Sequence, residues 1–152
     1  MALIPNPLAS RSESPATVSA ERWAAIKLLA IDVDGVLTDG RLTIHESGDQ
    51  AQTFSIRDGF GLVAARRAGI TVAWVSGRES PMARRRFAEL ELHHCILDCD
   101  DKAGAVRALQ EQLGLAPNAC CFIGDDVPDL AAFAVCGLRV AVADAAPAVS
   151  AR

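Results

Sequence analysis

The chain has few aromatic residues and no long hydrophobic run. Aromatic side chains make up 5% of its 152 residues while hydrophobic residues reach 51%, so Ala, Val, Leu and Ile must fill most of the core. No apolar run approaches the roughly 18 residues that a membrane-spanning helix needs, so we expect no membrane partner. The length suits one domain with a sizeable core.

Basic clusters and secretion signals are also missing. The formal net charge is −4, and no basic block alternates with aromatic residues, which argues against a nucleic-acid partner. Residues 1–22 lack the charged start and long apolar core of a signal peptide. Their prolines and small polar residues predict a flexible N-terminal arm, followed by a single domain over residues 23–152.

Paired cysteine motifs are absent too. The chain has five cysteines, an odd number with no CxxC pair, and its three histidines have no ligand-like spacing with them, which disfavours a zinc site. We expect free and mostly buried thiols, as suits a reducing cytoplasm.

Apolar runs alternate with helical patterns along the predicted domain. The runs that predict strands are residues 27–33, 70–75, 94–98, 119–124 and 138–142. The helical patterns cover about residues 58–68, 79–91, 102–113 and 127–135. This alternation predicts βαβ units and a mainly parallel sheet, that is, a Rossmann-like, doubly wound α/β fold.

Residues 41–57 interrupt this alternation. Two short β-like runs, 42–45 and 52–56, surround a turn signal at 46–49, which predicts a β-hairpin projecting near the edge of the sheet. Between Asp39 and Ser76 there is room for this hairpin and one helix, so we expect no cap domain.

Two carboxylates, Asp32 and Asp34, stand two residues apart where the first predicted strand ends. In an extended chain such residues point to the same side. Two anions that close are costly unless they share a cation, and oxygen ligands suit Mg²⁺. An acidic turn after a strand is the alternative interpretation of such a pair.

Other polar groups follow later strands. Ser76 and Asp125 each come at the end of an apolar run, and ligands of open parallel sheets bind outside the carboxyl ends of the strands. Lys102 begins a helical segment, where a lone lysine is ordinarily exposed to solvent. For Ser76 the alternative interpretation is a polar strand end or a helix cap.

Together these motifs, Asp32-x-Asp34, Ser76, Lys102 and the acidic run 125–129, resemble those of the haloacid dehalogenase superfamily over about residues 26–149. The resemblance implies that Asp32 is a nucleophile that forms an aspartyl-phosphate, and that Asp34 is a general acid and then a base.

The same resemblance implies a phosphate and metal site. Ser76 and Lys102 would bind the phosphate, and Mg²⁺ would be held by Asp32, the backbone oxygen of Asp34, and Asp125. Of Asp126 and Asp129, one would support the metal shell and the other would cap the helix that Pro128 begins.

Residue 34 separates reaction types within this superfamily. Haloacid dehalogenases lack the second aspartate and transport ATPases carry Thr there, so Asp34 favours a phosphatase or a phosphomutase. Phosphomutases need a sizeable cap domain to exclude water, and the expected absence of a cap therefore favours hydrolysis.

Longer strings give a closer resemblance. Residues 32–40, 54–61, 124–129 and 141–145 resemble the 3-deoxy-D-manno-octulosonate 8-phosphate (KDO 8-phosphate) phosphatases, which act in lipopolysaccharide precursor synthesis. The resemblance implies that a small anionic sugar phosphate is the substrate. Besides Asp34 and Lys102, it places at the substrate Ser55, Ile56, Arg57, Asp58, Gly59, Arg78 and Arg86.

The same family implies a capless, cytoplasmic homotetramer in which the hairpins of neighbouring chains pack together and complete the mouth of each active site. Such ribbons are marginal alone, and this one carries several apolar residues. Family members continue past Pro147 with a further strand, a helix and a tail, whereas the sequence ends at Arg152, so we expect a short C-terminus. Two alternatives stay open: a phosphatase of a nine-carbon keto-sugar phosphate, and a non-catalytic oligomerisation module.

Overall fold

A five-stranded parallel sheet forms the centre of the structure, a computed structural model that describes residues 18–150. The strand order is β5-β4-β1-β6-β7, and each neighbouring pair is parallel. The strands are β1 (Leu28–Ile31), β4 (Thr71–Val75), β5 (His94–Ile96), β6 (Cys120–Gly124) and β7 (Leu138–Ala141). Each lies within a predicted run, so the predicted parallel sheet is confirmed.

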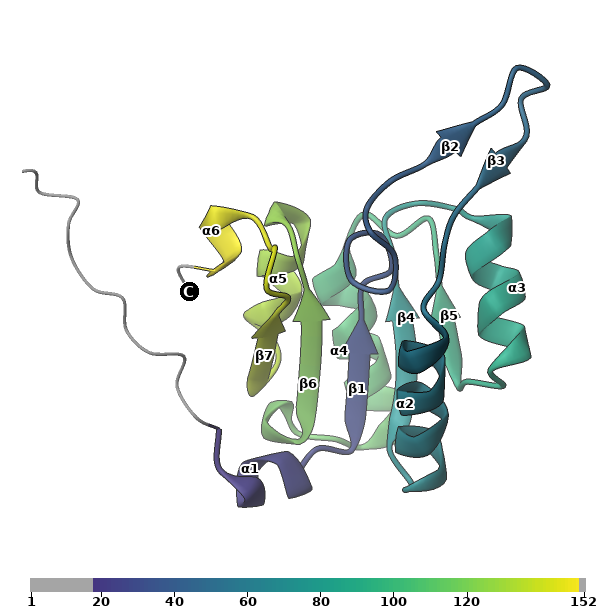
Figure 1. The fold of residues 1–152 in the computed structure, drawn as a ribbon. Helices are drawn as coiled ribbons and strands as arrows, with labels where there is room; N and C mark the ends of the chain where they lie inside the picture. The colour runs from purple at the N-terminus through teal and green to yellow at the C-terminus, as the bar shows by residue number, and fades with distance from the viewer. Residues whose placement is uncertain (1–17, 151–152) are drawn as a thin grey trace, which may run out of the picture.

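Helices cover both faces of this sheet (Figure 1). The helices α2 (Ile56–Arg67) and α3 (Pro81–Glu89) pack on one face, where Leu62 and Ala83 meet Ile31 and Trp74. The helices α4 (Lys102–Leu113) and α5 (Leu130–Phe133) pack on the other. The doubly wound arrangement is therefore confirmed.

Several boundaries differ from the predicted ones. The helix expected from residue 58 starts at Ile56, because Ser55 caps it by accepting the amide of Asp58. The pattern at 127–135 divides into a 3-10 turn, η2 (Val127–Asp129), and the short helix α5.

Short helical segments complete the described chain. They are α1 (Ala20–Ala24), η1 (Pro117–Ala119) and α6 (Pro147–Ser150). Most of the expected N-terminal arm lies outside the described residues, and its last part, from Ala20, belongs to α1. Among residues 18–150, no helix combines the length and hydrophobicity needed to cross a membrane.

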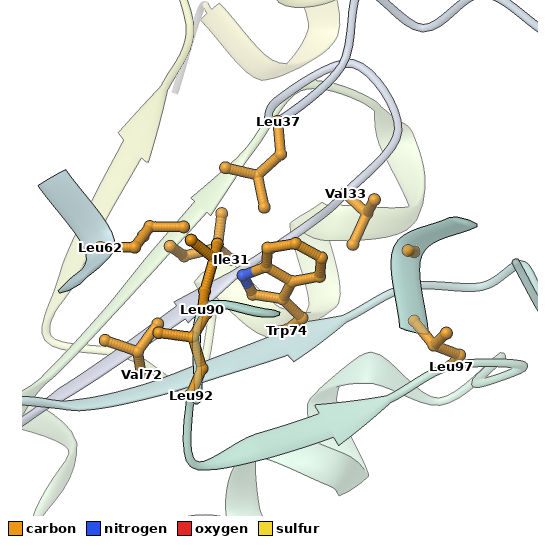
Figure 2. Packing of buried hydrophobic residues seen from close by; sticks show 10 residues of the cluster. Ile31, Val33, Leu37, Leu62, Val72, Trp74, Leu90, Leu92 and Leu97 are labelled. Atoms are coloured by element: carbon orange, nitrogen blue, oxygen red, sulfur yellow. The ribbon is translucent and has the colours of Figure 1, made fainter. Parts of the chain in front are cut away.

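Five of the seven aromatic residues lie in the core or pack against it, whereas Trp23 and Phe60 are exposed. Trp74 is 1% exposed and lies among aliphatic side chains of the sheet, α2 and the end of α3 (Figure 2). Its ring stacks on Phe54 with centroids 6.0 Å apart and meets Phe87 edge-on at 5.5 Å. On the opposite face, Phe122 meets Phe133 edge-on at 5.8 Å. Aliphatic residues fill most of the core on each face of the sheet, as the composition predicts. Each of these two cores also contains aromatic rings in contact with one another.

The five cysteines are free, with Cys120 and Cys121 fully buried and the others partly exposed. The expectation of free thiols is thus confirmed, whereas the expectation that most of them are buried is wrong, because only two of the five are.

The predicted hairpin within residues 41–57 is formed by β2 (Thr43–Ile44) and β3 (Gln50–Ala51), which pair antiparallel in a sheet of their own. The run 52–56, predicted as the second strand, is not one, because the pairing ends at Ala51 and Ile56 already begins α2. It extends beyond the carboxyl ends of the central strands (Figure 1). Ile44 on this ribbon is 66% exposed. The chain then returns through Phe54, which anchors the base of the hairpin on Trp74.

Candidate active site

The carboxyl ends of the three central strands place chemically useful groups around one cleft. Asp32 follows β1, Ser76 follows β4 and Asp125 follows β6. Since these strands are adjacent and parallel, their ends lie at one edge of the sheet. The cleft there, of about 360 Å³, is lined by these residues together with Asp34, Arg78 and Lys102.

Lys102 lies buried between two carboxylates. Its Nζ is 2.9 Å from Asp32 Oδ1 and donates a 2.7 Å hydrogen bond to Asp129 Oδ1. The side chains of Lys102 and Asp32 are 5% and 8% exposed. The position of Lys102 in the sequence alone would indicate an exposed residue at the start of a helix. In the structure it is instead the buried cation at the centre of an acidic cluster.

Burial governs the ionisation of this cluster. Burial raises the pKa of Asp32 to about 7, an effect that Lys102 opposes and Asp129 adds to. Burial alone would lower the pKa of Lys102, but Asp32 and Asp129 outweigh it and raise that pKa. The pKa of Asp125 is also raised, by burial and by Asp129. The cluster has more carboxylates than one lysine can neutralise, so a further cation would favour their charged forms.

The donor set suits a hard divalent cation. One oxygen from each of Asp32, Asp125 and Asp129 lies within 4.8 Å of the others. Within residues 18–150, Oδ1 of Asp125 is buried without a hydrogen-bond donor, and Oδ1 of Asp32 is buried with Lys102 Nζ 2.9 Å away. Buried carboxylate oxygens without donors are costly, and Mg²⁺ prefers such ligands. The residues present therefore fit the metal that the sequence predicts.

Asp129 and Asp126 have different contacts. Both oxygens of Asp129 are occupied, Oδ1 by Lys102 and Oδ2 by the backbone amides of Asp125 and Asp126. Asp126 is exposed and caps the turn η2 by accepting the amide of Val127. Of the two acidic residues left open by the sequence, Asp129 is the one joined to the cluster and Asp126 is the one that caps.

The loop after β1 wraps closely around the site. Thr38 Oγ1 accepts the amides of Gly35 and Gly40 and so closes the turn. Gly35 has φ +97°, and a Cβ there would collide with the Asp125 carboxylate. Only glycine satisfies both conditions, which explains its place after the acidic pair.

The carboxylate of Asp34 accepts hydrogen bonds from a second set of donors. Its carboxylate accepts two hydrogen bonds from Arg78, from Nε at 3.0 Å and from Nη2 at 2.8 Å. A third donor is the side-chain amide of Gln52, whose Nε2 lies 2.5 Å from Asp34 Oδ1. Arg78 thus reaches the cleft, as expected, where it is paired with the acidic motif.

Residues 55–59 do not line this cleft. Ser55 and Asp58 border a neighbouring cleft beside the loop 36–39. Ile56 is 83% exposed, and Arg57 forms no ion pair within the described part of the chain. Arg86 packs against Gly59 in the groove between α2 and α3 and pairs with Glu89 at 2.9 Å. One chain alone therefore gathers Asp32, Asp34, Ser76, Arg78, Lys102 and Asp125, but not residues 55–59 or Arg86.

The sequence of this chain matches that of a known protein family. The sequence model of the haloacid dehalogenase-like hydrolases matches residues 49–137. The chain is 45% identical over 120 residues to the KDO 8-phosphate phosphatase of Haemophilus influenzae, a match covering 79% of this chain and 67% of that enzyme. This chain belongs to the haloacid dehalogenase-like hydrolases, in the branch that contains those phosphatases.

A second sequence relative and a solved structure support the same family membership. The Escherichia coli K12 phosphatase is 38% identical over 122 residues, or 80% of this chain and 65% of that enzyme. The crystal structure of the Moraxella catarrhalis enzyme, in complex with magnesium, phosphate and KDO, superposes with a TM-score of 0.81 at 39% identity, covering 85% of this chain and 76% of that one. The chain spans about two thirds of the length of the two sequence relatives.

Two side chains that are joined to Asp34 through hydrogen bonds, Gln52 and Ser80, were not predicted from the sequence. Gln52 lies in a run that predicts only a strand, and Ser80 follows the motif at 76–78. Ser80 is 1% exposed, caps α3 by accepting the amide of Ala83, and donates a 2.7 Å hydrogen bond to Gln52 Oε1. No local pattern identifies such a contact, because it joins residues 28 positions apart through the fold.

Proposed function

We propose that this chain is a Mg²⁺-dependent phosphatase that hydrolyses KDO 8-phosphate to the free sugar acid and phosphate. The observation that carries the proposal is the buried Asp32 carboxylate, whose Oδ1 lies 2.9 Å from Lys102 Nζ, in a cleft that Arg78 and Asp125 also line. A nucleophile, a cation for phosphate and an anion-binding guanidinium are thus grouped where ligands of such sheets bind.

Asp32 is the proposed nucleophile. One of its oxygens attacks the phosphorus in line, the bond from phosphorus to the sugar oxygen breaks, and Asp34 gives its proton to the departing oxygen. A water then attacks the aspartyl-phosphate while Asp34 takes a proton from it. Phosphate leaves and the Asp32 carboxylate is restored.

The remaining groups hold charge in place. Ser76 and Lys102 bind phosphate oxygens, and Lys102 also keeps Asp32 oriented. Asp32, the backbone oxygen of Asp34, and Asp125 would hold Mg²⁺, with Asp129 supporting the backbone at 125–126. When bound, the cation neutralises charge on the carboxylates and on the phosphate.

Arg78 is the proposed anchor for the acidic sugar, because a guanidinium suits carboxylate and phosphate oxygens. Residues 55–59 and Arg86 would contact the sugar from a neighbouring copy, since one chain does not bring them to its own cleft.

That assignment requires self-association, and we propose a homotetramer in the cytoplasm. Ile56 and Phe60 are exposed and line one groove on α2, and Ile44 is exposed on the hairpin. These side chains support a contact between copies, because large exposed apolar groups mark interaction surfaces. Sedimentation of the purified protein would give a tetramer mass, and a monomer at micromolar concentration would contradict the assembly.

A substrate panel tests the specificity. We expect kcat/KM to be highest for KDO 8-phosphate, lower for a nine-carbon keto-sugar phosphate, and lowest for an aryl phosphate. A preference for the nine-carbon sugar would transfer the assignment to that substrate. A folded tetramer that releases phosphate from none of them would identify the oligomerisation module instead.

A further inference from the structure

We propose that Gln52, at the base of the hairpin, is a positioning residue that orients Asp34 for proton transfer to the leaving sugar oxygen. The inference rests on the proposed function of Asp34 as general acid. It adds a role for the hairpin within its own chain, because Gln52 directly follows β3.

The hydrogen bonds fix which end of the Gln52 amide faces Asp34. Ser80 Oγ already accepts the amide of Ala83, so its hydroxyl proton is available for Gln52 Oε1 at 2.7 Å. With its oxygen held by Ser80, Gln52 must present its NH₂ group to Asp34 Oδ1. This orientation suits a carboxylate, which only accepts hydrogen bonds when ionised.

Ser80 gives this contact a rigid support. Its side chain is 1% exposed and is the N-cap of α3, a helix packed on the sheet through Ala83. Gln52 is half-buried and is the only hairpin side chain, among the described hydrogen bonds, that reaches the acidic motif. The base of the hairpin is therefore joined to both α3 and the end of β1.

Substrate binding should affect the hydrogen bonds of Gln52 and Arg78 to Asp34 differently. Arg78 is cationic, and an incoming phosphate or sugar carboxylate competes with Asp34 for its guanidinium. Gln52 is neutral and its oxygen is engaged, so it keeps its bond when the anion arrives. With Oδ1 still held by Gln52, Oδ2 of Asp34 is the oxygen freed to carry the transferred proton.

Leaving-group dependence tests this role. A sugar alkoxide is strongly basic and needs a proton as it departs, whereas p-nitrophenolate does not. We expect Gln52→Met to lower kcat/KM for KDO 8-phosphate by about 10-fold or more, a part of what general acids contribute, and to change kcat/KM for p-nitrophenyl phosphate less than about 2-fold. The matched control is Gln112→Met, the same change at an exposed position near the end of α4, for which we expect wild-type values on both substrates.

A second pair of variants separates this inference from the proposed function. Asp34→Asn should lower kcat/KM for KDO 8-phosphate far more than kcat/KM for p-nitrophenyl phosphate, because kcat/KM reports the departure of the leaving group and not the later attack of water, which is common to both substrates. If it does so while Gln52→Met matches the wild type, the role of Gln52 is wrong and that of Asp34 stands. If Asp34→Asn affects both substrates equally, or the wild type hydrolyses neither, the general-acid assignment fails and the inference with it. If Gln52→Met does not fold, Gln52→Leu replaces it with the same expected ratio.

Discussion

Lys102 donates a 2.7 Å hydrogen bond to Asp129, and both side chains are almost completely buried, at 5% and 1% exposure. Both oxygens of Asp129 accept hydrogen bonds, and Asn has only one oxygen, so either Lys102 or the backbone amides of Asp125 and Asp126 would lose their acceptor. We therefore expect Asp129→Asn to lower the free energy of unfolding of the metal-free protein by about 1–3 kcal/mol, measured by urea unfolding.

Asp126→Asn is the matched control for that change. Asp126 is exposed and caps η2, and Asn is as good a cap as Asp, so we expect a change within about 0.5 kcal/mol. Equal destabilisation by the two variants would mean that the buried pair has no special importance.

Lys102 itself should matter for every substrate. A neutral residue of similar length removes the cation facing both Asp32 and the phosphate. We expect Lys102→Met to lower kcat/KM by about 100-fold or more for sugar and aryl phosphates alike, as for the loss of one preorganised charge stabiliser. A loss confined to the sugar phosphate would contradict the role of Lys102 at the phosphate.

Asp32 gives the metal-free protein a distinct pH dependence. Its pKa is raised from its usual value of 3.8 to about 7, so between these values the folded protein holds a proton that the unfolded chain releases. The contribution of Asp32 to stability is therefore greatest near pH 4 and is lost as the pH rises to about 7.

Thermal unfolding in EDTA from pH 5 to 8 measures this effect. Asp32→Asn should flatten the decline in stability across this range. Mg²⁺ competes with the proton, so its stabilisation of the wild type should grow as the pH rises. A wild-type profile identical to that of Asp32→Asn would contradict the raised pKa.

Gly35 should be irreplaceable for a reason beyond its backbone angle. Gly35 and Gly48 both have positive φ, +97° and +86°, but a Cβ at Gly35 collides with the Asp125 carboxylate while one at Gly48 meets nothing within 4 Å. Alanine at either position costs about 1–2 kcal/mol of backbone strain.

Mg²⁺ affinity then distinguishes the two glycines. We expect Gly35→Ala alone to weaken Mg²⁺ binding, by about 10-fold or more, because it displaces Asp125. Calorimetric titration with Mg²⁺ checks this, and equal affinities for Gly35→Ala and Gly48→Ala would show that the clash is relieved without cost to the site.

The sheet and the edge where the site forms were predictable from the sequence because they depend on local patterns. The strand β4 is a continuous apolar run ending on Ser76, and parallel topology then places Ser76 beside Asp32. Lys102 is different, because its burial depends on Asp129, which lies 27 residues later. The contact between Gln52 and Asp34 likewise depends on where the hairpin returns, which no periodicity specifies. Residues 55–59 form a helix start that faces away from the cleft, so their proposed role needs a second chain.

The most direct test of the account is phosphate release from KDO 8-phosphate by the wild type and by Asp32→Asn, each with Mg²⁺ and with EDTA. We predict release only by the wild type with Mg²⁺, because both the nucleophile and the cation are needed. Release by Asp32→Asn, or undiminished release in EDTA, would contradict the central claim that a metal-dependent Asp32 carries out the reaction.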